Sequence, residues 1–457
     1  MNARLENKES FYKTLVMIAL PITLQSLLQA SLTILDGLMV GQLGEQYIAT
    51  IALSNRFFYI YQYIIAALVG GAAIFISQFW GKEDTKSIVK TLKIPLLIGM
   101  AVLVVFGIIV FGFPSQSIGI FTKDKSVIVD GAYLQKLYYI SALPLLLTSI
   151  YATLLRSTCN VKLPMIAGII SIVLDTILNY VLIFGKFGFE ALGAEGAVIS
   201  TVIARWLEAL ILFTFIYIKK KPFSFRITEV FTYKLDKTFT KCFWKAMWPL
   251  FTLNLVYVLA DTIYSRIYGL IGTNEMAAMS ILFPIQGFSI GLFSGLSSAT
   301  GIILGNKLGS NKTDTAVTYA KRILRISTLL TFVIAVVLVV ISDFYLGLFN
   351  ISADVYDKSK MLIYVAAIFL CVRVLNMIIG QGIIQSGGDT KYILFLDIIG
   401  MWCIGVPLAY LAAFVFQLPI YVVYCFVSIE EVVRLILGLR KVRSKQWAVN
   451  LVDDISA

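Results

Sequence analysis

Residues 21–44 read PITLQSLLQASLTILDGLMVGQLG, and residues 249–272 read PLFTLNLVYVLADTIYSRIYGLIG. Both stretches open on a proline, continue as a long apolar run and end in Gly-x-x-Gly, 228 positions apart. Two later landmarks keep this register: Gln78-Phe-Trp-Gly81 returns as Asn306-Lys-Leu-Gly309, and the segment 156–162 returns, shifted by one position, as 385–391. The chain is therefore predicted to be a duplication of one half. In a hydrophobic chain, two similar halves are typical of a transporter whose substrate binds between them.

Composition places this chain in a lipid bilayer. Hydrophobic residues make up 59% and charged residues 14% of the 457, whereas soluble domains average about 45–50% and about 25%. A spanning helix needs about 20 apolar residues, and the absence of period-2 alternation excludes a β-barrel. We predict an all-α membrane protein with about twelve spans, near residues 13–42, 51–79, 92–113, 131–155, 163–185, 192–218, 244–271, 277–304, 323–349, 359–386, 392–416 and 420–438.

Basic residues gather in alternate loops, which indicates the topology. They precede the first span and follow the even-numbered ones, as Arg4, Lys8, Lys13, Lys82, Lys86, Lys90, Lys93, Arg156, Lys162, Lys307, Lys312, Lys391, Arg440, Lys441 and Arg443 do. By the positive-inside rule, both termini lie in the cytoplasm of a multi-pass protein of the cytoplasmic (inner) membrane. The net charge of +12 is thus topological, and we expect no nucleic-acid partner.

Six spans in each half make the halves parallel repeats, related by an axis along the membrane normal. We predict an N-terminal lobe at 1–222, a cytoplasmic linker at 223–243 and a C-terminal lobe at 244–457. The basic and aromatic linker suits a stretch that lies on the inner leaflet, so membrane lipid is an expected partner.

Several kinds of chemistry are excluded by what the chain lacks. It contains no histidine, and its five cysteines are scattered without a Cys-x-x-Cys pair. It also has no Gly-x-x-x-x-Gly-Lys-[Ser/Thr] sequence, so direct use of ATP is not expected. We therefore predict no enzyme, no metal site and no cofactor, and we expect a monomer.

Polar residues inside the first-half spans form continuous faces. An aspartate at mid-bilayer costs roughly 2.5–3.5 kcal/mol on insertion scales, so each one needs a reason. The spacing places Asp36, Asp175, Asn179 and Thr201 in a predicted cation-coupling cluster, and Gln25, Gln29, Asn55, Tyr59 and Gln62 along a predicted substrate cavity. Two carboxylates in a low-dielectric site repel each other, so the pair could hold one proton at neutral pH. The alternative is that each aspartate accepts hydrogen bonds in helix packing.

The second half carries different polar residues at the equivalent positions. Its seventh span adds four residues to the predicted cavity, with Tyr264 in register with Asp36: Asn254, Tyr257, Asp261 and Tyr264. Asp261 could contact substrate or serve as a structural partner. Tyrosines on these stripes suit flat or cationic molecules.

The remaining charged residues inside spans are expected to pair with one another. An arginine in a span normally has a partner, so we expect Arg373 to form a salt bridge, for instance with Asp397. Two further sets are expected to be end-of-helix pairs: Glu430, Glu431 and Arg434, and Arg205 with Glu208.

The ordered motifs resemble the multidrug and toxic compound extrusion (MATE) family over nearly the whole chain. They are Pro21…Gln25…Asp36-Gly-Leu-Met-Val-Gly41-Gln-Leu-Gly44, Ser77-Gln-Phe-Trp-Gly81, Leu178-Asn179-Tyr-Val-Leu-Ile-Phe-Gly185, Gly193-Ala-Glu-Gly196-Ala-Val-Ile-Ser-Thr201, Gly305-Asn-Lys-Leu-Gly309 and Ser386-Gly-Gly-Asp-Thr-Lys391. The resemblance implies two six-helix lobes that form a V, and cation-coupled export of drugs or metabolites. It implies that Asp36 is the cation-coupling acid and that Thr201 belongs to the same site.

The chain departs from the family pattern at three places. Asp175 precedes Asn179, whereas members usually show Asn four residues before Asp or Asn. Asn254 is followed by Leu255 where many members carry Glu, and the tenth span around 372–376 lacks an acid. A cation site of that type in the second half is therefore not expected.

We accordingly expect an antiporter that exports organic, amphipathic or cationic small molecules in exchange for H⁺ or Na⁺. The sequence does not choose between these ions or name the substrate. A lipid-linked saccharide flippase of the same superfamily is the alternative within transport, although it would favour about 14 spans and a strongly basic cavity. A membrane-embedded enzyme and a channel are the alternatives of other classes.

Overall fold

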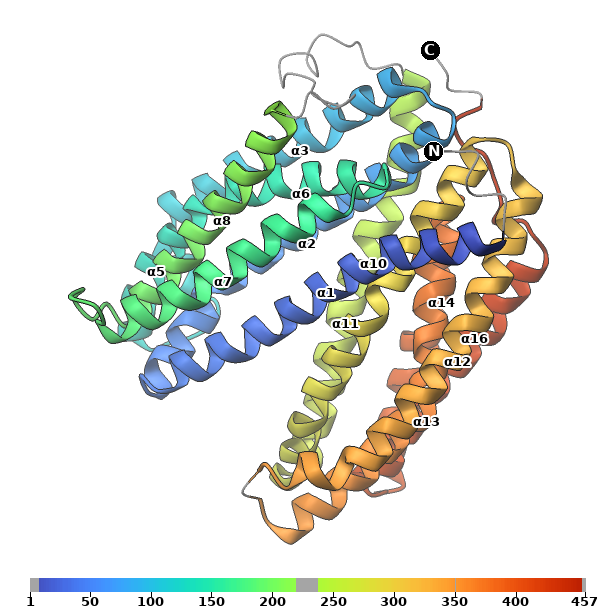
Figure 1. The fold of residues 1–457 in the computed structure, drawn as a ribbon. Helices are drawn as coiled ribbons and strands as arrows, with labels where there is room; N and C mark the ends of the chain where they lie inside the picture. Colours follow the sequence, from blue (N-terminus) through green and yellow to red (C-terminus); the bar gives the residue numbers. More distant parts are fainter. Residues whose placement is uncertain (1–7, 219–236, 350, 454–457) are drawn as a thin grey trace. The chain divides into compact units, whose positions relative to one another are not determined.

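In the computed structural model, residues 8–218, 237–349 and 351–453 are described, and within them the chain is helical without a strand (Figure 1). Of the predicted linker at 223–243, only the last seven positions fall inside these ranges. Basic Arg4 also lies outside the described residues. The predicted all-α fold is confirmed.

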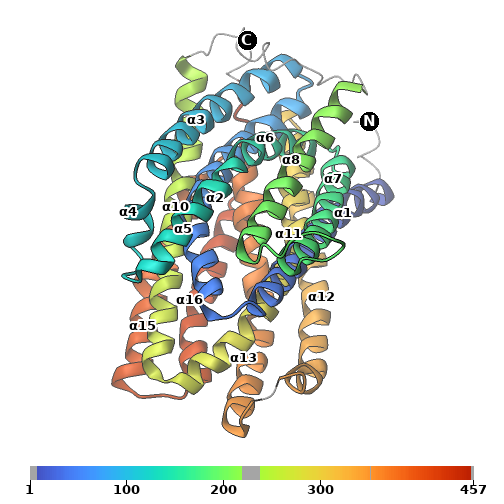
Figure 2. The same cartoon turned by 90° about the vertical axis from the view of Figure 1, so that its left-hand side faces the viewer.

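The first half forms one series of helices. Its members are α1 (Lys8–Gly41), α2 (Glu45–Gly81), α3 (Thr85–Gly112), α4 (Pro114–Gly119), α5 (Lys125–Ile140), α6 (Ala142–Ser157), α7 (Lys162–Phe184) and α8 (Ala194–Ile218). Helices α5 and α6 follow one another across Ser141 as a single apolar stretch. Figures 1 and 2 show α7 and α8 side by side, and they pack along their length.

The second half repeats the long helices but interrupts two of them with π-helical turns. Its members are α10 (Lys237–Ile271), α11 (Thr273–Gly309), α12 (Thr313–Leu346), α13 (Ala353–Met377), η2 (Ile378–Ile384), α14 (Thr390–Asp397), η3 (Ile398–Gly405), α15 (Val406–Tyr410), η4 (Leu411–Val415) and α16 (Ile420–Arg443). Such π-turns inside helices are frequent at functional sites.

Eleven helical stretches among the described residues are long and apolar enough to cross a membrane. The last helix, α16, has 24 residues but is not among them, since it carries buried charged side chains. Together with α16 these stretches agree with the predicted number of about twelve. The chain is a multi-pass membrane protein.

Packing divides the chain into two compact units. The N-terminal unit comprises residues 24–243, and the C-terminal unit comprises residues 244–455 together with residues 1–23. Within the C-terminal unit, the Phe11 ring lies 4.3 Å from the Tyr319 ring, and the Thr23 hydroxyl donates to the carbonyl of Leu292 at 3.2 Å. The predicted lobe boundaries, which place residues 1–23 in the N-terminal lobe, stay a prediction.

Helix ends follow from local side chains. Asp84 and Asp124 cap α3 and α5, since their carboxylates accept from the backbone N–H groups of Ser87 at 3.0 Å and Ser126 at 2.9 Å. Gly185 ends α7 in the left-handed conformation, with φ +63°, where a side chain would be strained.

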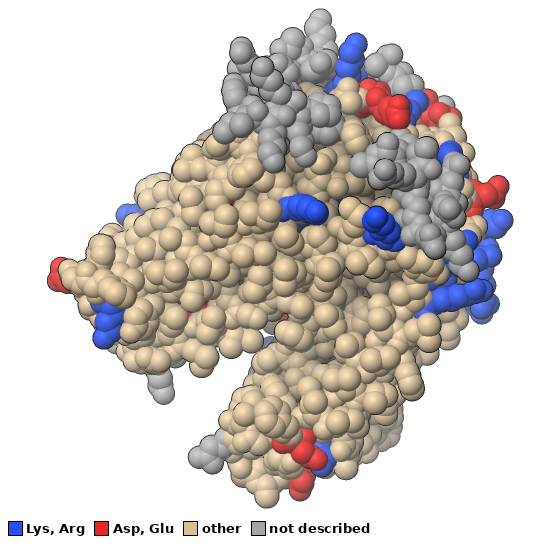
Figure 3. Space-filling view, viewed as in Figure 1, with Lys and Arg blue, Asp and Glu red and all other residues tan. Residues whose placement is uncertain are grey.

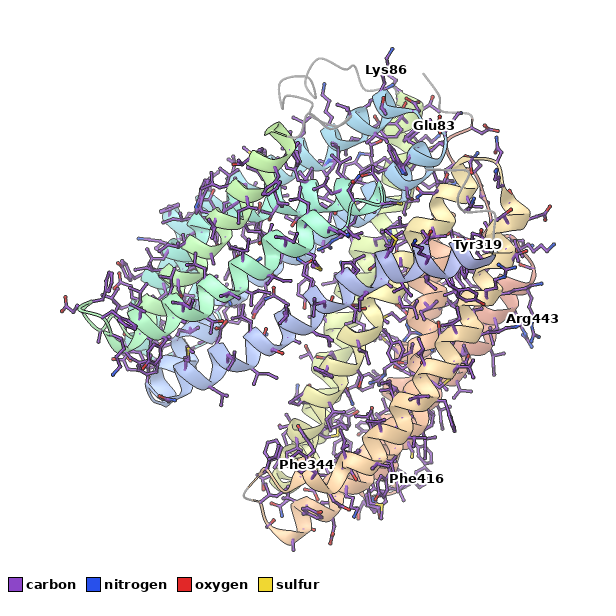
Figure 4. All side chains as sticks on the ribbon, viewed as in Figure 1. Glu83, Lys86, Tyr319, Phe344, Phe416 and Arg443 are labelled. Atoms are coloured by element: carbon purple, nitrogen blue, oxygen red, sulfur yellow. The ribbon has the colours of Figure 1, made fainter. Side chains whose placement is uncertain are left out.

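Charged side chains lie mainly near the ends of the helices, whereas the helix sides in the space-filling view are almost uncharged (Figure 3). In the C-terminal unit, Tyr319 and Arg443 lie toward one end, and Phe344 and Phe416 toward the other (Figure 4). This distribution is what a lipid environment around the helix sides requires.

Candidate functional site

An open cavity of about 930 Å³ lies within the N-terminal unit and is lined by residues of α1, α2, α5, α6, α7 and α8. It brings together every first-half residue that the sequence assigned to the coupling cluster or the substrate cavity. These lining residues are Gln25, Gln29, Asp36, Asn55, Tyr59, Gln62, Asp175, Asn179 and Thr201. A volume of this size suits a small organic molecule, because ligand pockets usually measure about 300–1,000 Å³.

A chain of neutral hydrogen bonds holds Asp36 in place. Asn179 donates from Nδ2 to Asp36 Oδ1 at 2.8 Å, and the Ser200 hydroxyl donates to Asn179 Oδ1. Because the serine fixes which side of the amide accepts, the amide N–H₂ must face the carboxylate. No ion pair among the described residues includes Asp36, so its carboxylate is held by a neutral amide.

Asp175 lies one turn before Asn179 on α7 and is only 4% exposed. Its Oδ1 atom has no hydrogen-bond partner, and the carboxylate is close enough to Asp36 for the two to interact electrostatically. Thr201 bonds to this carboxylate and the charge of Arg205 acts on it, but a buried carboxylate oxygen without a partner stays costly unless it takes up a proton or a cation. No group of three or more His, Cys, Asp or Glu side chains that could hold a metal ion occurs among the described residues.

The close approach of α7 and α8 makes this arrangement possible. At Gly196, near the start of α8, an added Cβ would lie 2.7 Å from the carbonyl carbon of Leu182 on α7. Only glycine allows the two backbones to approach so closely. One turn later, the same helix presents Ser200 to Asn179, and the next residue, Thr201, lines the cavity.

Sequence reasoning did not assign the basic side chains of Arg156 and Arg205 to the cavity. Arg156 on α6 donates from Nη2 to Gln25 Oε1 at 2.8 Å, and Arg205 pairs with Glu208 at 3.3 Å, all four lining the cavity. Arg205 and Glu208 form the expected i,i+3 pair, but they belong to the cavity wall. The repeat had marked Arg156, yet a basic residue beside a predicted loop was interpreted as a topological charge.

The cavity residues predicted from the seventh span do not share this cavity. On α10, Asn254 is half-buried, whereas Tyr257 and Asp261 are exposed. Tyr264 is 8% exposed in the core of the C-terminal unit, and its hydroxyl donates to Glu430 Oε2 at 2.6 Å. In this structure Tyr264 therefore packs inside its unit, while the roles of the other three stay predictions.

Arg373 forms a salt bridge as expected, but the suggested partner Asp397 is wrong. Arg373 Nε lies 3.4 Å from Glu431 Oε1, and Asp397 instead pairs with Arg434, which also lies 3.5 Å from Glu431 Oε2. Nor are the α16 acids a simple end-of-helix pair, since Glu430 and Glu431 are 4% and 6% exposed inside the unit. Spans were identified from hydrophobicity, but hydrophobicity does not give the rotation of each helix about its axis.

Glycines on η3 make room for this buried network. An added Cβ at Gly400 would meet the Arg434 side chain, and one at Gly405 would overlap both the Glu430 carboxylate and the Tyr264 hydroxyl. Asn376 adds a further bond by donating to Glu431 Oε2 at 2.7 Å. The polar residues of the C-terminal unit are thus largely engaged with each other.

Comparison with known proteins shows similarity along both halves of the chain. The MatE family model matches residues 21–181 and 249–411. The uncharacterized transporter YisQ of Bacillus subtilis (strain 168) is 24% identical over 413 residues, covering 90% of each chain. The probable multidrug resistance protein NorM of Thermotoga maritima is 22% identical over 441 residues, covering 95% of this chain and 93% of that relative.

Solved structures share the fold. A crystal structure of a MATE protein in complex with MaD3S superposes with a TM-score of 0.86 at 16% identity, covering 95% of this chain and 96% of that one. An outward-facing multidrug resistance MATE family transporter of the MOP superfamily gives a TM-score of 0.85 at 16% identity, with 95% and 96% covered.

Proposed function

The chain belongs to the MatE family of membrane transporters, and on that premise we propose that it is a cation-coupled antiporter that exports organic solutes. It is a transporter and not an enzyme. Its exported solutes are amphipathic or cationic small molecules, such as drugs or metabolites, and the coupling ion is H⁺ or Na⁺. It acts as a monomer in the cytoplasmic membrane with both termini in the cytoplasm, and it binds no nucleic acid.

The observation that carries this proposal is the pair of carboxylates in the cavity wall. Asp36 has a neutral partner and Asp175 has an orphaned oxygen, so both can change their cation occupancy without breaking an ion pair. They share the cavity with the aromatic ring of Tyr59, which suits an aromatic or cationic solute. Ion occupancy and solute occupancy of one cavity can then favour different conformational states.

The available driving force is sufficient. One proton that moves inward down about 100 mV releases about 2.3 kcal/mol, and one pH unit adds about 1.4 kcal/mol. Together these sustain a gradient of roughly a few hundred-fold for an uncharged solute, since each 1.4 kcal/mol is about tenfold. Export of this kind needs no ATP.

The test is transport by Asp36→Asn in proteoliposomes, with the pH gradient and the Na⁺ gradient imposed separately. Asparagine keeps the shape and can still accept from Asn179, but it cannot carry the exchangeable charge. We expect wild-type protein to respond to one gradient and the variant to neither, with unchanged thermal unfolding. The matched control is Asp124→Asn, since Asp124 is an exposed helix cap outside the cavity. Undiminished gradient-driven export by Asp36→Asn would refute the assignment.

A further inference from the structure

We propose that Arg156 is an anion-binding residue and that the preferred solutes carry an acidic group, such as a carboxylate, in addition to an apolar or cationic part. The inference rests on the proposed function, because it concerns the solute that occupies the same cavity. It goes further by assigning the end of the cavity that the coupling carboxylates do not occupy.

The guanidinium of Arg156 has unused hydrogen-bonding capacity. It offers five N–H donors in a rigid fork, and among the described residues Nη2 donates to Gln25 Oε1 at 2.8 Å. Its Nε atom is buried without any acceptor. A carboxylate can accept two parallel bonds from such a fork, which gives both affinity and orientation.

Arg156 also forms no ion pair among the described residues. Glu208 acts on it electrostatically, but the Glu208 carboxylate is within 3.3 Å of Arg205 and forms its ion pair there. No carboxylate forms an ion pair with Arg156 among the described residues. A desolvated cation without a partner is costly, so the site is completed by an anionic group that enters the cavity.

The partner side chain that orients Arg156 is itself held in place. Gln25 packs on Gly168 of α7 so closely that an added Cβ there would lie 2.5 Å from Gln25 Nε2. Because the amide N–H₂ is turned toward Gly168, Oε1 faces the guanidinium. The fork is thus oriented before any solute binds, which lowers the entropy cost of binding.

The cavity is polarised along its length. Gln25, beside Arg156, and Asp36 are eleven positions apart on α1, which corresponds to about 16 Å along a helix. One end therefore presents the Arg156 guanidinium, and the other presents the carboxylates of Asp36 and Asp175. The Arg205–Glu208 ion pair also lines the cavity, and its two opposite charges largely offset each other. An elongated zwitterion would place its acid at Arg156 and its cationic part toward the carboxylates.

A purely structural role for Arg156 would have different consequences. The residue lies in the last turn of α6, where a cation interacts favourably with the helix C-terminus. That interaction does not depend on whether the bound solute carries an acid. Selectivity for the acid is therefore the readout that separates the two roles.

The experiment measures binding of two dyes to the purified full-length protein by fluorescence anisotropy. Rhodamine B carries a free carboxylate, and its ethyl ester has the same ring system without that charge. We expect wild-type protein to bind rhodamine B more tightly than the ester. We expect Arg156→Gln to weaken rhodamine B binding about tenfold or more while changing ester binding less than about twofold, because a charged hydrogen bond is lost only for the acid. Arg156→Lys, which keeps the charge but loses the fork, should be intermediate.

The ratio of the two dissociation constants is compared between variants, so that dye partitioning into detergent cancels. The matched control is Arg440→Gln, since Arg440 is exposed in the last turn of α16. The proposal would be overturned if Arg156→Gln weakened the binding of both dyes equally, if the ratio of their dissociation constants stayed unchanged, or if wild-type protein did not prefer the acid. Export of the ester by wild-type vesicles is measured separately, so failure of the transport function is distinguishable from failure of acid recognition.

Discussion

Replacing Gly196 by alanine should separate α7 from α8 at the point where they hold the proposed coupling residues. The new Cβ would lie 2.7 Å from the carbonyl carbon of Leu182 and 2.8 Å from its oxygen. Carbon atoms in favourable contact are about 3.5–4.0 Å apart, so the backbones must move apart by roughly 0.8 Å or more. Overpacking of this kind costs about 1–3 kcal/mol, partly offset by the better helix propensity of alanine, which is worth about 1 kcal/mol over glycine.

The separation should also affect function, because Ser200 on α8 bonds to Asn179 on α7. Loss of that neutral hydrogen bond, worth about 1 kcal/mol, would loosen the amide that faces Asp36. We expect the gradient-driven export rate to fall by roughly fivefold, since about 1.4 kcal/mol is tenfold.

The assay combines thermal unfolding of the purified protein with export from proteoliposomes. For a unit of about 200 residues, 1 kcal/mol shifts the midpoint by about 2–4 °C, so the N-terminal unit should unfold measurably earlier. The control is Gly112→Ala at the end of α3, where nothing lies within 4 Å of the added Cβ. If Gly196→Ala unfolds at the wild-type temperature and exports at the wild-type rate, the close approach does not hold the site and the reasoning is refuted.

Two predictions concern the C-terminal unit. Glu431→Gln should lower its stability by about 3–5 kcal/mol, because two partly buried arginines lose the buried carboxylate that they share. Asp354→Asn, which removes an exposed ion pair, should cost about 1 kcal/mol or less, and denaturant unfolding followed by Trp fluorescence measures both variants. Gly405→Ala should lower the unfolding temperature, because the new Cβ displaces the Glu430 carboxylate. Gly287→Ala in α11, where nothing lies within 4 Å of the added Cβ, should leave that temperature unchanged. An equal shift of the unfolding temperature in the two variants would contradict the packing argument.

Much of the fold could be predicted because it depends on strong, additive signals. Each long apolar run makes a helix in lipid, where every backbone group must bond within its own segment. The 228-residue register between Pro21 and Pro249 adds the duplication, and the helices α1 and α10 both extend through these prolines. The break of the later spans into π-helical turns could not be predicted, because it depends on how individual side chains pack.

The residues of the candidate site were likewise predicted only in part. Asp36 and Asp175 were identified because a carboxylate inside a span is costly and therefore informative. Ser200 was missed, since a serine in a helix near small residues is unremarkable until its partner Asn179 is known. The sequence did not show that Arg434, and not Arg373, pairs with Asp397. Which side chains pair depends on how each helix is rotated about its axis, and hydrophobicity does not give that rotation.

The duplicated halves use their polar residues in opposite ways, and this asymmetry bears on where coupling can occur. Asp36 and Tyr264 occupy equivalent positions, yet Asp36 lines an open cavity, whereas Tyr264 is bonded to Glu430 within a buried core. Changing the protonation of Glu431 would unpair two arginines and cost several kilocalories per mole, about 3–5 for a broken buried pair. Changing the occupancy of Asp36 breaks no ion pair. A cation that binds and leaves in every transport cycle should therefore use the N-terminal unit.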